Sequence, residues 1–163
     1  MKKRIWLLPL LILTSVLLTG CALQTVNEMY ALPKRSKEYD NLQSAIDSAM
    51  YGLSYSAPVS GENQQTVQMA DLDGDGVEEY IVFAQGNSAN PLQVLIFRQE
   101  EDGTCRLMEV IQSNGSAFEQ VEYVQMDNAP GYELVVGRQL SDQVLRSVSV
   151  YSFSSGSAEQ LMM

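Results

Sequence analysis

Apolar side chains recur at every third or fourth position between Ser36 and Leu53, and polar side chains fill most of the positions between them. This spacing is typical of an amphipathic helix with one apolar stripe. Ser36 can cap the start of the helix, and Gly52 stands near its end. The pattern predicts one amphipathic helix over residues 36–53, whose stripe packs on the domain that follows. The stripe consists of Leu42, Ala45, Ile46, Ala49, Met50 and Leu53.

From Gln65 onward the chain consists of short runs rich in Val, Ile, Tyr and Phe, separated by turns rich in Asp, Gly, Asn and Pro. Such runs and turns are typical of β-strands joined by tight connections. Consecutive strands of this length predict one antiparallel meander sheet. The predicted strands are Thr66–Ala70, Glu79–Gln85, Leu92–Arg98 and Cys105–Ile111.

The second half of the chain repeats the first when it is shifted by 54 residues without a gap. A four-stranded repeat of this length is typical of the blades of a β-propeller. The predicted fold class is mainly all-β, with one helix followed by two four-stranded antiparallel, propeller-blade-like repeats over 62–113 and 116–163, the second incomplete. The identical pairs are Val67/Val121, Asp73/Asp127, Glu79/Glu133, Val82/Val136, Gln85/Gln139, Val94/Val148, Leu107/Leu161 and Met108/Met162.

Two repeats are too few for a closed propeller, which has about four to eight blades. Two arrangements follow from this count. In the first, which we favour, the chain is a truncated piece of a longer propeller protein. In the second, the two sheets pack face to face as a small sandwich.

The N-terminus has the features of a targeting segment. Lys2, Lys3 and Arg4 precede an apolar run that is shorter than the roughly 20 residues a membrane span needs. The run ends in Leu18-Thr19-Gly20-Cys21, which resembles the lipobox of bacterial lipoprotein signals. The resemblance implies removal of residues 1–20, lipid on Cys21, a tether over 21–35, and anchorage to the bacterial cell membrane facing outside the cytoplasm. A transmembrane anchor and an ordinary secretory signal are the alternatives.

Composition excludes several classes of function. The chain has no histidine, so it carries no Ser-His-Asp or Cys-His nucleophile pair and no HExxH zinc site. Its formal net charge of −10 argues against a nucleic-acid surface. Removal of residues 1–20 would take away three basic and no acidic residues, which leaves 7 Lys and Arg against 20 Asp and Glu, a net charge of −13.

The loop between the first two predicted strands carries alternate carboxylates, Asp71, Asp73 and Asp75, separated in part by glycines. These groups can converge on one hard cation, with the backbone carbonyl of Val77 and the carboxylate of Glu79 completing an oxygen shell. Oxygen ligands favour calcium. An EF-hand would place a bidentate glutamate at loop position twelve, where this chain has Val82. The alternative is a solvated acidic hairpin that binds nothing.

The motif D-x-D-G-D-G-x-x-E before a hydrophobic strand resembles the calcium loop of the FG-GAP and VCBS family of integrin-like propeller repeats, over residues 62–163. The resemblance implies a structural calcium ion held by Asp71, Asp73, Asp75, the backbone of Val77, and Glu79. In the second repeat only Asp127 and Glu133 remain, since Gln125 and Ala129 replace the other carboxylates. We expect no second metal site there, only a turn of the same shape supported by Pro130 and Gly131.

These features predict a non-enzymatic, membrane-anchored, calcium-stabilised binding module for a protein or glycan partner. The alternatives are a cell-envelope accessory hydrolase that uses Asp and Glu, for example Glu78 with Glu79, and a calcium-dependent adhesion or assembly subunit. We expect Cys105 to be a small core residue. The strand aromatics are expected in the core as well; they are Tyr80, Phe83, Phe97, Phe118, Tyr123, Tyr132, Tyr151 and Phe153.

Overall fold

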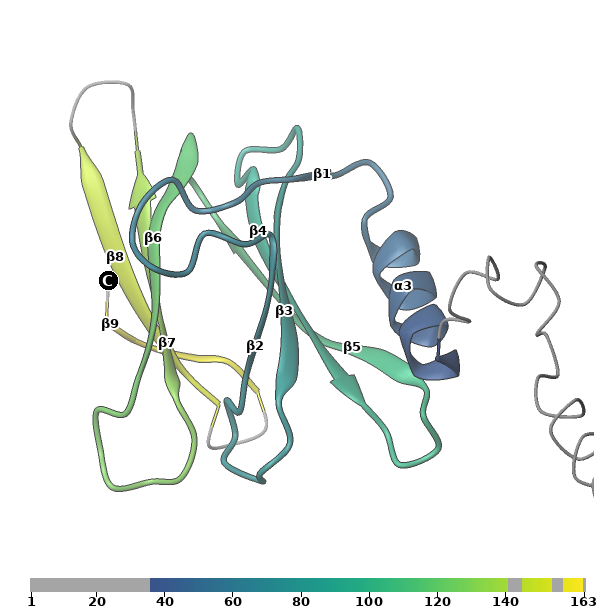
Figure 1. Cartoon of the computed structure of the whole chain (residues 1–163). Coiled ribbons are helices and arrows are strands. Elements are labelled where there is room, and N and C mark those ends of the chain that lie inside the picture. The colour runs from purple at the N-terminus through teal and green to yellow at the C-terminus, as the bar shows by residue number, and fades with distance from the viewer. Residues whose placement is uncertain (1–35, 141–144, 154–156, 163) are drawn as a thin grey trace, which may run out of the picture. The chain divides into compact units, whose positions relative to one another are not determined.

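The computed structural model describes residues 36–140, 145–153 and 157–162. The predicted signal peptide (residues 1–20), the predicted lipidation site Cys21 and the predicted tether (21–35) lie outside this part of the chain. The elements, in chain order, are α3 (Lys37–Ala49), β1 (Ser54–Tyr55), β2 (Val67–Ala70), β3 (Glu79–Gln85), β4 (Leu92–Gln99), β5 (Cys105–Ser113), β6 (Ala117–Val124), β7 (Glu133–Gln139), β8 (Arg146–Ser152) and β9 (Glu159–Met162) (Figure 1). Within the described residues, no helix is both long and apolar enough to cross a bilayer.

Helix α3 begins where the sequence predicts and ends earlier. The hydroxyl of Ser36 accepts a hydrogen bond from the backbone N–H of Tyr39 (3.2 Å), as an N-cap residue does. The helix ends at Ala49 rather than at Leu53, and Gly52 follows with a positive φ of 77°. A residue in this left-handed conformation ends a helix, and glycine adopts it without strain.

The first sheet, sheet A, contains five strands in which β3 is central. Strands β3, β4 and β5 form the predicted antiparallel meander. Strands β1 and β2 both pair with the other edge of β3, where β1 covers Ala84 and Gln85 and β2 covers the opposite end. The two-residue strand β1 is missing from the sequence prediction because so short a segment has no periodicity.

The second sheet, sheet B, repeats sheet A with the predicted offset. Its strand order is β6-β7-β8-β9, and β7, β8 and β9 each begin 54 residues after β3, β4 and β5. The registers also correspond: Tyr80 pairs with Phe97 in sheet A, and Leu134 pairs with Tyr151 in sheet B. The chain is therefore mainly β, with one helix and two antiparallel sheets in its described part, as the fold-class prediction states.

Two apolar clusters hold these layers together. One lies between the sheets and joins Ile81, Phe83 and Val94 of sheet A to Val121 and Val136 of sheet B. The other lies on the opposite face of sheet A, where Ile46 of α3 packs with Val82 and Phe97. Sheet A thus lies between α3 and sheet B (Figure 1).

The two sheets stack head to tail. Val82 of sheet A faces α3, whereas its counterpart in the repeat, Val136, faces sheet A. Ile81 of β3 faces sheet B. Its counterpart in the repeat, Val135, lies on the outer side of sheet B, because neighbours along a strand point to opposite faces and Val136 points inward. Unlike faces meet in neighbouring units of a repeat array, whereas like faces would meet in a twofold sandwich.

Most of the strand aromatics lie where the sequence predicts. Phe83, Phe97 and Phe118 are fully buried, and the rings of Phe83 and Phe118 meet edge to face across the sheets, 5.1 Å apart. The prediction for Tyr132 is wrong, since its side chain is 46% exposed. Tyr132 precedes β7 in the loop, so the pleat of the strand does not point it inward. Cys105 is half-buried at the edge of the α3 cluster.

Candidate functional site

The acidic loop between β2 and β3 is closed by hydrogen bonds from its own backbone. The Asp71 carboxylate accepts from the N–H groups of Gly74 (2.7 Å) and Gly76 (2.9 Å). Asp73 and Asp75 each accept from the N–H two residues further on. Gly74 and Gly76 have φ values of 78° and 87°, and this left-handed conformation lets the loop curl around Asp71.

Three of the predicted metal ligands come together. One carboxylate oxygen each from Asp71, Asp73 and Glu79 lies within 4.8 Å of the other two. Asp75 lies outside this cluster, and the side chain of Val77 is half exposed. Glu79 is buried at the start of β3, and its Oε2 accepts a hydrogen bond from the N–H of Leu72 (2.9 Å), which ties the loop to the strand.

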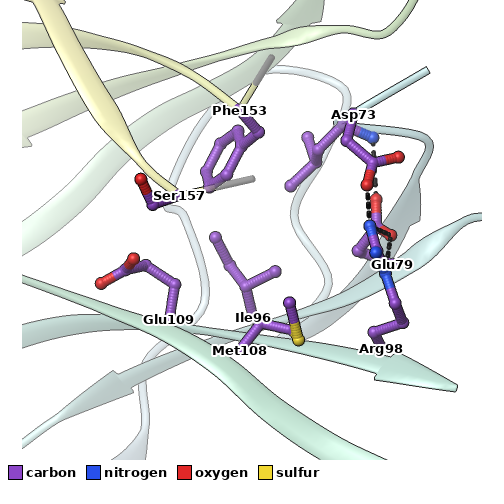
Figure 2. Close-up of a pocket in the computed structure, with 9 residues that line it drawn as sticks. Asp73, Glu79, Ile96, Arg98, Met108, Glu109, Phe153 and Ser157 are labelled. Atoms are coloured by element: carbon purple, nitrogen blue, oxygen red, sulfur yellow. Dashed lines mark hydrogen bonds and ion pairs between the residues drawn. The ribbon is translucent and has the colours of Figure 1, made fainter. Parts of the chain in front are cut away.

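A cation that the sequence prediction missed lies in this cluster. The Arg98 guanidinium donates from Nε and Nη2 to Glu79 Oε1, at 3.1 and 3.0 Å. Its Nη2 also pairs with Asp73 and lies 3.9 Å from Asp75. Figure 2 shows Arg98 reaching the carboxylates of Asp73 and Glu79 from the neighbouring strand. The register could have revealed it, because Tyr80 pairs with Phe97 and so Glu79 stands opposite Arg98.

The donor set agrees with calcium in its chemistry, since all of its side-chain atoms are carboxylate oxygens. A positive group already lies at this position, because the Arg98 guanidinium pairs with two of the three carboxylates. Clustered carboxylates repel one another unless a cation is near, and Arg98 supplies that charge from within the chain. Calcium therefore has to displace Arg98 to use Asp73 and Glu79 together.

The cluster borders a small cavity between the sheets. The cavity has a volume of about 20 Å³ and is lined by Asp73, Glu79 and Arg98 together with apolar residues such as Ile96 and Phe153 (Figure 2). This is room for about one water molecule. Burial raises the pKa of the Glu79 carboxyl; the hydrogen bond from Leu72 lowers it, and the negative charges of Asp75 and Asp71 raise it further.

The equivalent loop of the second repeat has the same hydrogen bond between the buried glutamate and the backbone of the loop, which we call the clasp. Glu133 is buried, and its Oε2 accepts a hydrogen bond from the N–H of Met126 (2.8 Å), just as Glu79 accepts from Leu72. Asp127 Oδ1 accepts from the N–H of Ala129 (2.6 Å). In place of Arg98 the second repeat has Ser152.

The two loops are also packed against each other. A Cβ on Gly74 would lie 2.3 Å from the carbonyl carbon of Pro130, and one on Gly131 would lie 2.7 Å from the carbonyl oxygen of Leu72. The N–H of Tyr132 donates to the carbonyl oxygen of Asp71 (3.0 Å). Glycine at position 74 therefore serves both the curl of the acidic loop and the contact between the repeats.

Among the remaining acidic residues, Glu109 lines the same cavity as the cluster, whereas others lie on the surface. Glu78, Glu101 and Asp102 are exposed. Hydrogen bonds from Thr104 lower the pKa of Asp102, as in a turn that is closed by its own side chain. Comparisons of the chain with protein-family models, with curated proteins and with solved structures find no match.

Proposed function

We propose that this protein is a non-enzymatic interaction module, tethered by lipid on Cys21 to the outside of a bacterial membrane, that binds a protein or glycan partner through blade-like β-repeats. The head-to-tail stacking of the two sheets is the observation that carries this proposal. Repeat units stacked in this way build extended surfaces, and such arrays commonly serve binding. The FG-GAP and VCBS resemblance of the acidic loop supports the same function.

The size of the cavity favours binding over hydrolysis at the acidic cluster. Glu79 has a raised pKa and lies near Asp73, which is the arrangement a carboxylate-based hydrolase needs. The adjoining cavity of about 20 Å³ takes about one water molecule and not a sugar ring. Arg98 also pairs with both carboxylates and hinders a role for either as a nucleophile or base.

Calcium has a limited part in this proposal. The ion stabilises the acidic loop only to the extent that it binds more tightly than the Arg98 guanidinium, which is already in place. Binding that is coupled to displacement of a bound group is weakened by the cost of the displacement. A calcium-dependent adhesion or assembly role requires the partner itself to bind only in the calcium-loaded state.

The proposal is tested in bacterial cells that produce the full chain or its Cys21→Ser variant. We expect metabolic labelling with a fatty acid to mark the wild type and not the variant, and the variant to leave the membrane fraction. Chemical crosslinking before purification should capture a partner reproducibly with the wild type. Addition of a chelator separates the adhesion alternative, in which capture is lost.

A hydrolase is tested on the same material. Glu79→Gln removes the charge of the buried carboxylate, and Glu101→Gln is the control at an exposed turn. Release of sugar from cell-envelope glycan by the wild type and the control, but not by Glu79→Gln, would contradict a non-enzymatic function. A wild type that carries no lipid would contradict the tether.

A further inference from the structure

A row of side chains crosses the face of sheet A that carries α3. Tyr55 on β1 pairs with Ala84 on β3, and Ala84 pairs with Gln93 on β4. Gln93 in turn pairs with Gln112 on β5. Directly opposed residues of antiparallel strands share a face, and Ala84 belongs to the apolar cluster under α3. The four residues therefore lie side by side on one face, and we call them the Tyr–Gln row.

The row lies where α3 ends. Near the start of the helix, Asn41 donates from Nδ2 to the carbonyl oxygen of Gly103 (2.8 Å), in the turn between β4 and β5. Leu53, in the segment after the helix, lies over Gly86, just after the other end of β3. A Cβ on Gly86 would lie 2.7 Å from Leu53 Cδ2 and 3.6 Å from Gln93 Nε2. Figure 1 shows the chain passing from this end of α3 into β1. The exposed part of the row is therefore beside the C-terminal end of α3.

The row presents an aromatic ring and two amides that the fold leaves unused. Tyr55 is 49% exposed, Gln112 is exposed and Gln93 is half-buried. Among the described residues, none of these three side chains has a hydrogen-bond partner. A primary amide has two N–H donors and a carbonyl acceptor. Tyr51, in the turn between α3 and β1, adds a second ring that is 93% exposed. Rings and amides are thus available to a ligand.

The chemistry of the row favours a neutral ligand. None of its four side chains carries a charge, although the formal net charge of the chain is −10. A charged ligand would lose water there without gaining an opposite charge. A protein–protein interface buries about 800 Å² on each partner, which is more than a single row of four residues offers. A neutral molecule with both apolar C–H faces and hydroxyl groups matches a tyrosine ring beside two amides.

We propose that the Tyr–Gln row binds a flat, neutral glycan, whose sugar rings stack on Tyr55 and whose hydroxyl groups form hydrogen bonds with the amides of Gln93 and Gln112. Tyrosine gives a large, rigid contact area at a small cost in conformational entropy. The amides give direction, because they both donate and accept hydrogen bonds. The inference rests on the proposed binding function and deepens it by naming a glycan as the partner.

The spacing of the strands sets the length of glycan that the row holds. Neighbouring strands lie about 4.8 Å apart, so Tyr55 and Gln112, which are separated by three such spacings, lie about 14 Å apart. A short run of linked sugar rings spans this distance. The glycan must run across the β-strands, because the row does. A monosaccharide reaches Tyr55 or Gln112 but not both, so a chain of several rings should bind more tightly.

The test uses the purified full chain, isotope-labelled for nuclear magnetic resonance, and two neutral probes, the β-linked tetramers of glucose and of N-acetylglucosamine. We expect at least one tetramer to shift the side-chain amide signals of Gln93 and Gln112 in a saturable way, and the corresponding monosaccharide to bind about tenfold more weakly. A tetramer of galacturonic acid, which carries a carboxylate on each ring, is the control of equal length. It should not bind, because the acidic chain repels its charge and the row holds no cation.

Tyr55→Ala should weaken binding of the tetramer about five- to tenfold, since it removes the stacking surface. Tyr132→Ala is the matched control, because Tyr132 is 46% exposed and lies outside the row, and it should leave binding unchanged. Gln112→Ala, at an exposed residue, serves if Tyr55→Ala does not fold, and should weaken binding about threefold.

Binding of neither tetramer, or equal binding by Tyr55→Ala and Tyr132→Ala, would overturn the site. A tetramer that shifts signals only on another surface would also overturn it, although the proposed binding function would stand. If neither tetramer binds and Tyr55→Ala loses a protein that the wild type captures by crosslinking, the row belongs to a protein partner instead. None of these results bears on the lipid tether, which fatty-acid labelling of Cys21 tests separately.

Discussion

The two β-repeats have the same arrangement of strands and differ in how the negative charge of each acidic loop is neutralised. Both loops place a buried glutamate at the start of the next strand, Glu79 in the first repeat and Glu133 in the second. The first loop adds three aspartates and receives Arg98 from the neighbouring strand. The second has one aspartate and has Ser152 where the first has Arg98.

Comparison of the two loops separates two roles of the glutamate. One is to accept a hydrogen bond from the backbone of the loop, and the other is to belong to a cluster of carboxylates that a cation neutralises. Glu79 and Glu133 each accept a hydrogen bond from the backbone N–H seven residues earlier, at 2.9 and 2.8 Å. The clasp is therefore present whether or not the loop has a full set of carboxylates. The additional carboxylates of the first loop repel one another and Glu79 unless a positive charge is near, and the Arg98 guanidinium provides that charge.

The largest expected effect concerns the contact between the two loops. Gly74→Ala should lower the free energy of unfolding by more than about 3 kcal/mol, because it adds left-handed strain and a collision with the backbone of Pro130. Gly76→Ala is the matched control, since its φ is similar and no atom lies within 4 Å of the added Cβ. It should cost about 1 kcal/mol from strain alone. Equal losses in urea unfolding would show that the loops do not press on each other.

Loss of the internal cation should come next. Arg98→Gln leaves Glu79 buried beside Asp71 and Asp73 with no positive partner, and should cost about 2 kcal/mol. Arg106→Gln breaks an exposed pair with Glu100 and should cost about 0.5 kcal/mol or less. Urea unfolding of both variants measures the difference. A loss for Arg98→Gln no greater than that for Arg106→Gln would mean that the loop does not depend on Arg98.

The clasp should contribute similarly in both repeats. Glu133→Ala leaves the N–H of Met126 without its acceptor and should cost about 1–2 kcal/mol, whereas Glu133→Gln retains an acceptor and should cost about 0.5 kcal/mol or less. Glu79→Ala loses the equivalent bond from Leu72 and should cost at least as much as Glu133→Ala. If Glu79→Ala alone is destabilising, the clasp is not shared.

The smallest effect concerns a hydrogen bond between the sheets. Tyr123 on β6 donates from its hydroxyl to Oε1 of Gln68 on β2 (2.7 Å), so Tyr123→Phe should cost about 1 kcal/mol at neutral pH. Burial raises the pKa of Tyr123 above its ordinary value of 10. The stability that the neutral phenol provides is therefore complete below pH 10 and is lost as pH rises above it. The variant should thus approach the wild type in alkaline unfolding experiments, and a constant difference would contradict the shift.

Much of the fold could be predicted from the sequence because the second half of the chain repeats the pattern of the first half. Strand β3 has the predicted bounds, Glu79–Gln85, and the 54-residue offset places β7, β8 and β9. Alternation of side chains does not say which face of a sheet meets which neighbour, so the head-to-tail stacking could not be predicted. The prediction for Tyr132 fails for a related reason. Tyr132 lies one residue before β7 begins, and the linear pattern does not show that the strand starts only at Glu133.

The candidate site could be predicted only in part. Asp71, Asp73 and Glu79 belong to one continuous motif, and the structure brings their carboxylates together. Arg98 lies 25 positions after Asp73 and enters the cluster only through the register of β3 with β4. The Tyr–Gln row likewise depends on strand register, because its four residues lie on four different strands.

Calcium titration of thermal unfolding tests most directly whether Arg98 replaces the metal in the first repeat. The wild type and Arg98→Gln are each melted with chelator and with millimolar calcium. We expect the wild-type midpoint to change little, and the variant, less stable in chelator, to gain about 1.4 kcal/mol when calcium is tenfold above its dissociation constant. A wild type that depends strongly on calcium, together with a variant as stable as the wild type in chelator, would contradict the internal cation.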